Sequence, residues 1–420
     1  MAVPAFTGPK APRMRIALVS YEFAGTPRGG GIGTYVRGAA EMLHGRGHEV
    51  EVFTAGTPEE MPASAFPIHS VDATREDFAE AIVPTFAARH TSAPFDVIEG
   101  PEYGADAAGI AATFEALPLV IKLHTPSFIL AEIHAAYIGR ASQLRFMAGA
   151  LRRGRWPTHL RAISDETGEK SVAQCADLVV GPSQAILDRV GSHWGISETR
   201  RMLVPNVFIA PRPLLLADPN TRTETVLYVG RLEVRKGVLE LADAVRRVLD
   251  ARPGTRFVFL GRALPMPNGT RDVKAEMMSR IGRHRDAVQF IDAVPYHEIA
   301  NYFSAADICV FPSVWENFPN VCLEAMAAAR GVIGSSAGGM AEMIEDGRTG
   351  LLVPPRSPAA IADRILTLLA DPERRIAMGQ AARAHVAASY TPDVIGPLHE
   401  ASYERAIANA AGRHHPQSAA

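Results

Sequence analysis

Short apolar runs alternate with longer runs of helical periodicity along the chain. The alternation forms two successive series, and an irregular stretch separates them. Strands that alternate with helices form parallel sheets joined by right-handed crossovers. The strands expected in the first series are residues 15–20, 48–53, 96–99, 119–123 and 178–180. Those expected in the second series are residues 225–229, 256–260, 288–291, 308–311 and 332–334. The sequence therefore predicts an α/β fold of two doubly wound, Rossmann-like domains, which suits a chain of 420 residues.

A proline-rich, irregular stretch at residues 211–219 separates the two series and is the best candidate for a linker. We therefore expect an N-terminal domain over residues 14–210 and a C-terminal domain over residues 222–390. Residues 1–13 are rich in alanine and proline and are predicted to be disordered, and residues 410–420 read as a loose tail.

Composition excludes several classes of function. The net charge is −2, which argues against a nucleic-acid partner. The three cysteines are far apart and form no C-x-x-C pair, which fits a reducing compartment better than a disulfide framework. The first residues lack the apolar core of a signal peptide, and no window of 18 apolar residues occurs. These features favour a cytoplasmic protein.

The most informative segment carries two carboxylates, Glu316 and Glu324, around a predicted helix start that follows a strand. Asn317 or Asn320 would be the N-cap of this helix. Bare amides at a helix start bind anions, and the two carboxylates can accept hydrogen bonds from hydroxyls on either side. A ligand with phosphate groups between two parts rich in hydroxyls would satisfy both the amides and the carboxylates, and a nucleotide sugar is such a ligand. The alternative is a capped amphipathic helix with two surface acids.

Two cations, Arg231 and Lys236, follow the first strand of the second series, where the ligand of such a sheet binds. Arginine offers a planar fork to phosphate oxygens and lysine a point charge. The sequence has no Asp-x-Asp triplet of the kind that holds a diphosphate through a metal. We therefore expect these cations to neutralise phosphate without a metal or other cofactor. The alternative is a solvated basic turn.

A glycine run at residues 29–33 precedes a helix expected at residues 32–46. The run does not form the G-x-G-x-x-G fingerprint of a dinucleotide site, because Thr34 or Val36 stands where the third glycine belongs. Nicotinamide binding is thereby disfavoured, and a loop that lines a cleft between the domains is the preferred interpretation.

Two further signals concern catalysis. His124 lies just past an expected strand, where catalytic groups gather, although a lone histidine is often structural. Residues 334–338 match the G-x-S-x-G elbow of serine hydrolases. A hydrolase would need an acid and then a histidine after the serine, and few histidines follow. We therefore expect Ser336 to resist a fluorophosphonate probe.

A basic stretch from Arg140 to Trp156 alternates arginines with large apolar residues. As a helix it would either lie on an anionic membrane, as a peripheral contact, or form an ordinary surface helix with one face in the core.

With these residues in view, the chain resembles family 4 glycosyltransferases of the GT-B fold, which are retaining enzymes. The likeness runs over about residues 15–407, and its motifs occur in the family's order. They are residues 29–33, 47–50, His124, 175–183, 204–206, 230–232, 236–237, 316–324, 338–342 and 347–353. The resemblance implies a nucleoside diphosphate sugar as donor, such as a UDP-sugar. It also implies that the last helix, about residues 391–409, packs back on the N-terminal domain.

The resemblance also implies roles for individual residues. Arg231 and Lys236 would hold the diphosphate, Glu324 the ribose hydroxyls and Glu316 the donor sugar, while His124 would lie beside the reacting sugar. The residues expected to carry catalysis are Arg231, Lys236, Glu316 and His124. Those expected to bind the donor are Gly30, Gly31, Gly33, Asn317, Phe318, Asn320, Val321 and Glu324.

The chain departs from the family at two places. Asn317 and Pro319 replace glycines at the start of the two-glutamate motif, and Pro319 has no amide to donate. The usual Gly-x-Pro-Val is here Ala-Arg-Gly-Val at residues 329–332. The first change alters the backbone amides expected to hold the sugar hydroxyls, so it bears on the choice of donor sugar and not on nucleotide binding.

The predicted function is transfer of a sugar from a nucleoside diphosphate sugar to an acceptor hydroxyl. The acceptor would be a carbohydrate or a lipid-linked sugar, in polysaccharide or glycolipid assembly for the cell envelope, with the enzyme cytoplasmic or peripheral on the inner membrane face. A sugar-nucleotide epimerase, a phosphorylase and a non-catalytic carbohydrate-binding protein remain as alternatives with the same fold.

Overall fold

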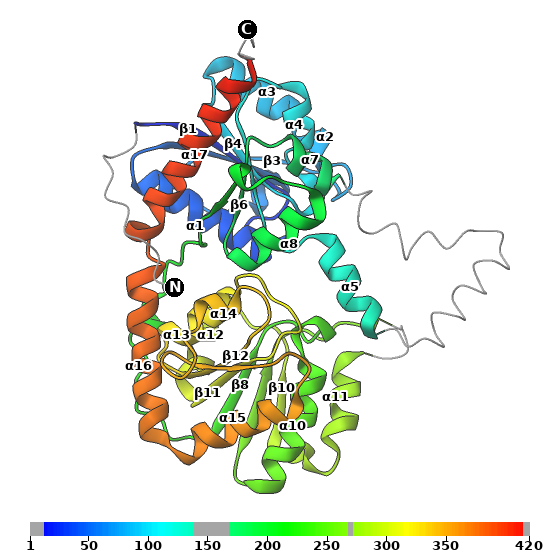
Figure 1. The fold of residues 1–420 in the computed structure, drawn as a ribbon, viewed down its shortest axis with the longest axis vertical. Coiled ribbons are helices and arrows are strands. Elements are labelled where there is room, and N and C mark those ends of the chain that lie inside the picture. Colours follow the sequence, from blue (N-terminus) through cyan, green and yellow to red (C-terminus); the bar gives the residue numbers. More distant parts are fainter. Residues whose placement is uncertain (1–11, 138–167, 268–271, 415–420) are drawn as a thin grey trace, which may run out of the picture. The chain divides into compact units, whose positions relative to one another are not determined.

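The computed structural model describes residues 12–137, 168–267 and 272–414, and within them the chain forms two compact units (Figure 1). Of the described residues, the first unit contains 12–128, 168–209 and 389–414, and the second contains 129–137, 210–267 and 272–388. The basic stretch at residues 140–156 and most of the N-terminal segment 1–13 lie outside the described residues. Within those ranges no helix is both long and apolar enough to cross a bilayer.

The first unit contains a parallel seven-stranded sheet of order β3-β2-β1-β4-β5-β6-β7. Its strands are β1 (Arg15–Ser20), β2 (Glu49–Ala55), β3 (Ile68–Val71), β4 (Val97–Pro101), β5 (Leu119–Lys122), β6 (Leu178–Gly181) and β7 (Arg201–Leu203). Its α-helices are α1 (Gly31–Gly45), α2 (Phe78–Ala81), α3 (Val83–Ser92), α4 (Ala108–Thr113), α7 (Glu169–Cys175), α8 (Gln184–Trp194) and α17 (Pro392–His414). Helix α5 (Ser127–Tyr137) begins in the first unit and ends in the second.

The strands predicted from apolar runs are the central ones. Strands β1, β4, β5 and β6 are almost entirely buried, as expected for parallel strands covered on both faces. The two edge strands, β3 and β7, were not predicted, because their residues are half-buried or exposed and their runs are short. The direction of strand order reverses between β1 and β4, which are adjacent. Ligands of such sheets bind at the carboxyl ends of strands beside this point.

Helix α17 packs against β4, β5 and β6 of the first unit. The Tyr403 hydroxyl donates to Glu99 at 2.8 Å, and the Arg46 guanidinium makes two bonds to Glu400, at 2.7 and 2.8 Å. Arg413, which forms an ion pair with Asp177, belongs to the same helix. The helix continues to His414, so the expectation of a loose tail from residue 410 is wrong for its first residues. Arg413 thus pairs with the residue that precedes β6.

The second unit contains a parallel six-stranded sheet of order β10-β9-β8-β11-β12-β13. Its strands are β8 (Thr225–Val229), β9 (Arg256–Leu260), β10 (Val288–Ile291), β11 (Ile308–Phe311), β12 (Gly331–Ser335) and β13 (Leu351–Val353). Its α-helices are α9 (Arg212–Leu215), α10 (Val238–Ala251), α11 (Val273–Ile281), α12 (Tyr296–Ala305), α13 (Asn320–Ala327), α14 (Met340–Met343), α15 (Pro358–Ala370) and α16 (Pro372–Ser389). The 3₁₀ turn η5 (Val234–Lys236) precedes α10.

The core of the second unit forms around α10, which contacts both α11 and α15 (Figure 1). Its apolar stripe recurs at helical spacing through Val238, Leu241, Val245 and Val248, all buried, and it joins the side chains of β8, β9 and β11 in one cluster. In this sheet the strand order reverses between β8 and β11. The turn after β8 and the loop after β11 therefore flank the point where such sheets bind ligands.

The stretch predicted to be a linker, residues 211–219, is instead fastened to the second unit. It contains α9, and the Arg383 guanidinium donates to the Ala217 carbonyl at 2.6 Å. Arg330 is fully buried and donates to the Asp218 carbonyl and, at 2.9 Å, to the Thr221 hydroxyl. Sequence reasoning missed this attachment because the arginines lie more than a hundred residues away.

Arg330 also follows an unusual helix end. The amide of Ala329 donates to Met326 O at 2.9 Å and that of Arg330 to Ala325 O at 3.1 Å, which is the Schellman pattern. The residue at its left-handed position is normally glycine, but here it is Ala329, with φ of 55°. A side chain at this φ crowds the carbonyl that follows it, so the helix end is strained.

We predict that Ala329→Gly raises the free energy of unfolding of the second unit by about 1 kcal/mol, because glycine adopts this φ without strain. Urea denaturation would measure the change. The matched control is Ala328→Gly, one residue earlier at a right-handed φ of −74°. That substitution should destabilise by about 0.5–1 kcal/mol. Equal effects of the two variants would contradict the assignment of strain to residue 329.

Candidate active site

The strand order of the second sheet reverses between β8 and β11, and we call this place its switch point. The turn after β8 and the loop after β11 pack closely together there. The turn after β8 ends at Gly237, whose φ is 69°, and a Cβ there would lie 1.9 Å from the Pro312 carbonyl oxygen. The amide of Val314 donates to Arg235 O at 2.8 Å. Only glycine fits at position 237, and this contact holds the turn from β8 against the loop from β11.

A buried ionic cluster joins these two loops. Glu316, from the loop after β11, accepts a hydrogen bond from the Lys236 ammonium and two longer ones from Arg235, at 3.2 and 3.3 Å. Arg235 also donates to Glu233 at 2.9 Å. Arg235, Glu233 and Glu316 are all buried. A carboxylate in such a place must be paired, because an unpaired buried charge is very costly.

The charge state of Glu316 follows from these contacts. Burial by itself would raise its pKa, but the charges of Lys236 and Arg235 and their hydrogen bonds lower the pKa to about 2. Glu316 is therefore an acceptor of hydrogen bonds at any physiological pH. It carries no proton that it could donate to a leaving group.

The structure separates the two cations that the sequence grouped together. Lys236 lies within the cluster and pairs with Glu316, and its role in binding the diphosphate stays a prediction. The side chain of Arg231 is 61% exposed and lies 3.3 Å from Glu233. Sequence reasoning missed Arg235, which lies next to Lys236. Its burial could not be read from a short charged run, since it depends on the loop that brings Glu316.

The helix after the two-glutamate loop starts differently from the expectation. Helix α13 begins at Asn320, its N-cap is Pro319, and no side chain caps it. The prediction that Asn317 or Asn320 is the N-cap is therefore wrong. Pro319 fits this place because its ring fixes φ near the extended value that the cap adopts, here −76°. Asn317 and Phe318 are buried beside the start of the helix, and Asn320 and Val321 form its first turn.

The G-x-S-x-G run has a structural role here. Gly338 has a φ of 75°, its backbone pairs with that of Glu316, and a Cβ there would lie 2.1 Å from the Glu316 carbonyl oxygen. The amide of Gly339 donates to the same carbonyl at 2.9 Å. The helix that follows, α14, has only four residues. Glycine at 338 thus fixes the backbone that carries Glu316.

Glu324 lies on α13 and is only 4% exposed. Its Oε1 accepts a hydrogen bond of 3.0 Å from the Tyr296 hydroxyl, and its Oε2 has no hydrogen-bond partner among the described residues. Burial raises the pKa of Glu324 to about 7, although the bond from Tyr296 acts in the opposite direction. Tyr296 was not predicted, because a tyrosine after a proline carries no sign of this contact.

In the first unit, His124 is held at the carboxyl edge by a buried acid. Its backbone amide donates to both carboxyl oxygens of Glu102, at 2.8 Å each. Three residues later, the amide and hydroxyl of Ser127 donate to Glu169 at 2.9 and 2.6 Å. Burial, and then the charge of Glu169, raise the pKa of Glu102 to about 8. Two acids that sequence reasoning missed thus fix the turn that carries His124.

The imidazole of His124 lies near a buried polar cluster. Its ring is 5.2 Å from that of Tyr35, whose hydroxyl donates to Glu99 at 2.5 Å. Lys122 lies 4.9 Å from the Tyr35 ring and donates to Val204 O at 2.6 Å. Burial and the charge of Lys122 lower the pKa of His124 well below its usual range. The side chain is therefore a neutral hydrogen-bonding group at physiological pH.

The glycine run begins α1, as the sequence predicted, with Gly30 as its N-cap. A Cβ on Gly30 would lie 2.3 Å from the Glu22 carboxylate, and one on Gly33 would lie 2.8 Å from the Phe23 backbone. A Cβ on Gly31 would meet nothing within 4 Å. Close packing therefore explains Gly30 and Gly33 within the first unit. A donor-binding role for the three glycines stays a prediction.

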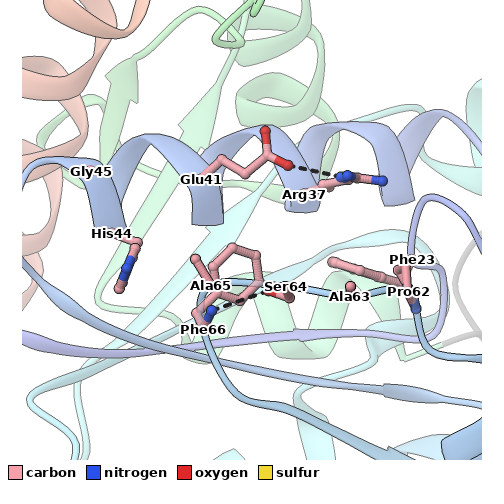
Figure 2. Close-up of a pocket in the computed structure, with 10 residues that line it drawn as sticks. All are labelled: Phe23, Arg37, Glu41, His44, Gly45, Pro62, Ala63, Ser64, Ala65 and Phe66. Atoms are coloured by element: carbon pink, nitrogen blue, oxygen red, sulfur yellow. Dashed lines mark hydrogen bonds and ion pairs between the residues drawn. The ribbon is translucent and has the colours of Figure 1, made fainter.

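A cavity of about 310 Å³ lies elsewhere on the first unit, between α1 and residues 62–66 (Figure 2). Arg37, Glu41 and His44 line it from the helix, and Pro62 and Phe66 from the opposite segment. It contains none of the residues predicted to form the active site. Among the described residues, no three or more His, Cys, Asp or Glu side chains are grouped so as to hold a metal ion.

Comparison with known protein families covers both units. The family described as "Glycosyl transferases group 1" matches residues 217–385, and the "Glycosyl transferase 4-like domain" matches residues 30–207. The chain belongs to the group 1 glycosyltransferases. The enzyme therefore transfers a sugar from a nucleotide sugar, and the hydrolase and non-catalytic hypotheses are set aside.

Individual relatives agree with this assignment. A "D-inositol 3-phosphate glycosyltransferase" of Kineococcus radiotolerans is 28% identical over 87% of this chain and 89% of its own. One of Corynebacterium glutamicum is 36% identical over 44% of each. A sucrose-phosphate synthase from Thermosynechococcus elongatus has a TM-score of 0.72 and 25% identity, covering 94% of this chain and 100% of its own. The GT-B fold predicted from the sequence is confirmed by this likeness.

We predict that Glu316→Gln lowers the free energy of unfolding of the glycosyltransferase at pH 7 by about 3 kcal/mol, because the partly buried Lys236 loses its anion and the buried Arg235 keeps only Glu233. The pKa of Glu316 is lower in the folded chain than its ordinary value of 4.5. The ion pair therefore stabilises fully above about pH 5, and its contribution is lost as the pH falls toward 2.

Urea denaturation from pH 7 down to pH 3 would test this. The difference between the wild type and Glu316→Gln should shrink steadily below about pH 4.5. The control is Glu373→Gln, which removes a surface carboxylate paired with Arg222 and should change stability little. A difference that stayed constant with pH would show that Glu316 is not ionised in the cluster.

Proposed function

We propose that the enzyme transfers a sugar from a nucleoside diphosphate sugar to an acceptor hydroxyl with retention of configuration and without a metal. The observation that carries this proposal is the cluster of Lys236, Arg235 and Glu316 at the switch point of the second sheet. A lysine next to a carboxylate that stays ionised at physiological pH fits a diphosphate beside a polyol. Lys236 and Glu316 are also the residues to which the family resemblance assigns the diphosphate and the donor sugar.

The electrostatic demand of the reaction is the negative charge that develops on the departing diphosphate. The Lys236 ammonium has three N–H groups and donates one hydrogen bond to Glu316. The other two N–H groups can donate to phosphate oxygens. The exposed fork of Arg231 can add two parallel bonds. Preorganised charges of this kind act most strongly where water is excluded.

The carboxylate and the imidazole would serve as orienting groups. Glu316 stays ionised at physiological pH and can accept hydrogen bonds from donor-sugar hydroxyls. His124, neutral and fixed by Glu102, can exchange a hydrogen bond with the sugar that reacts. We assign no protein nucleophile. An oxygen of the leaving phosphate would accept the proton of the acceptor hydroxyl.

We predict that Lys236→Ala lowers turnover by about 100-fold, the usual loss for one group that stabilises developing charge. Initial rates of nucleoside diphosphate release would measure it. The matched control is Lys274→Ala, which removes a lysine of the same unit that lies 5.4 Å from the Phe290 ring. Near-normal turnover in Lys236→Ala would remove this lysine from the mechanism.

We propose that phosphate charge is met by protein cations alone, and we therefore expect turnover to persist in excess EDTA. Activity assays with EDTA, then with added Mg²⁺ or Mn²⁺, would measure this. Loss of activity in EDTA that either ion restored would contradict metal independence.

The acceptor would be a carbohydrate or a lipid-linked sugar, in polysaccharide or glycolipid assembly of the cell envelope. Relatives named for D-inositol 3-phosphate put a phosphorylated polyol first in an acceptor panel. A cytoplasmic enzyme with peripheral contact to the inner membrane face would suit a lipid-linked acceptor.

The decisive experiment has two stages. Thermal shift with UDP-, GDP- and ADP-sugars would identify the donor, since a ligand that binds the folded state raises its stability by mass action. Proton NMR of the product would then give the anomeric configuration, and inversion would contradict retention. Incubation with donor alone, and then with phosphate, would reveal an epimerase or a phosphorylase instead.

A further inference from the structure

Glu324 is reached by one side chain from another element. The phenol of Tyr296, the first residue of α12, donates to its Oε1 at 3.0 Å. Tyr296 itself is 57% exposed, whereas Glu324 is 4% exposed. The tyrosine thus spans from the surface to a buried carboxylate, and the second oxygen of that carboxylate has no partner among the described residues.

The other charged side chains near α13 make hydrogen bonds or ion pairs with groups other than Glu324. Arg330 and Arg383 donate at 2.8 Å to backbone carbonyls at its C-terminal end, those of Ala328 and Ala327. Glu316 is paired with Lys236 and Arg235. Burial and the bond from Tyr296 are therefore the two influences that set the properties of the Glu324 carboxyl.

We propose that Tyr296 is a positioning residue for the donor's ribose: its phenol holds Oε1 of Glu324, so that Oε2 is presented as the acceptor for a ribose hydroxyl. This inference rests on the proposed function and deepens it, because it assigns a selectivity for ribose to a residue on another helix. It requires no displacement of the phenol, since each carboxylate oxygen can accept more than one hydrogen bond.

The phenol of Tyr296 also changes the pKa of Glu324, and this change would affect ribose binding. A carboxyl group accepts hydrogen bonds from hydroxyls freely through both of its oxygens only when it is ionised. Burial raises the pKa of Glu324 to about 7. The bond from Tyr296 lowers this pKa. Its removal therefore raises the pKa above 7, and more of the protein carries a protonated Glu324 at neutral pH. The ribose contact would weaken there and recover once the pH exceeds the new pKa.

The test uses Tyr296→Phe and, as the matched control, Tyr302→Phe on the same helix. Calorimetry would measure the binding of UDP, ADP and GDP and of their 2′,3′-dideoxy forms at pH 7 and pH 9. The ratio of the two affinities reports the ribose hydroxyls alone, because changes at Lys236 or in the fold affect both forms. We expect the wild type and Tyr302→Phe to favour the ribose form of the cognate nucleotide by roughly tenfold at pH 7.

Tyr296→Phe should lose most of this preference at pH 7 by weaker binding of the ribose form, and should regain part of it at pH 9. The affinity for the dideoxy form should not change. The inference is overturned if the preference is unchanged, if ribose binding becomes tighter, or if both forms weaken equally. Failure of every diphosphate to bind the wild type would instead overturn the proposed function, and this inference with it.

Discussion

The second unit depends on one interaction, the buried pairing of Glu316 with Lys236 and Arg235. Gly237 lets the turn after β8 approach the loop after β11 at Pro312, and Gly338 lets the loop after β12 approach the carbonyl of Glu316. Removing an anion from such a cluster leaves cations in a medium that solvates them poorly. The same pairing that secures the loops also holds a lysine and a carboxylate together at the point where the strand order of the second sheet reverses.

Burial gives the carboxyl groups of this enzyme different properties according to their neighbours. The two cations lower the pKa of Glu316 to about 2, while burial beside a single phenol raises that of Glu324 to about 7. Glu102, buried near another acid, has a pKa of about 8. One group is thus a permanent acceptor, whereas the other two change their protonation in the physiological range. Environment, and not residue type, decides which acids can respond to pH.

The central strands of both sheets were predictable because a parallel strand covered on both faces must be apolar throughout. The glycine run, the two-glutamate segment and Lys236 were also visible, since each begins or lies in the segment between an apolar strand and the helix that follows it. The edge strands β3 and β7 were not, because half-buried strands share their composition with loops. Arg235, Tyr296 and Glu102 were missed for a related reason: a single charged or aromatic residue in a turn or at a helix start shows no periodicity.

The sequence by itself determined the alternation of strands and helices, the family and the set of residues that follow the strand ends. These are local patterns, set by which side chains tolerate burial and which backbone positions require glycine. The tertiary structure decided which of those residues meet. It paired Glu316 with Lys236, left Arg231 in solvent, and joined Tyr296 to Glu324, because partners distant in the chain are brought together only by the packing of the sheet and its helices.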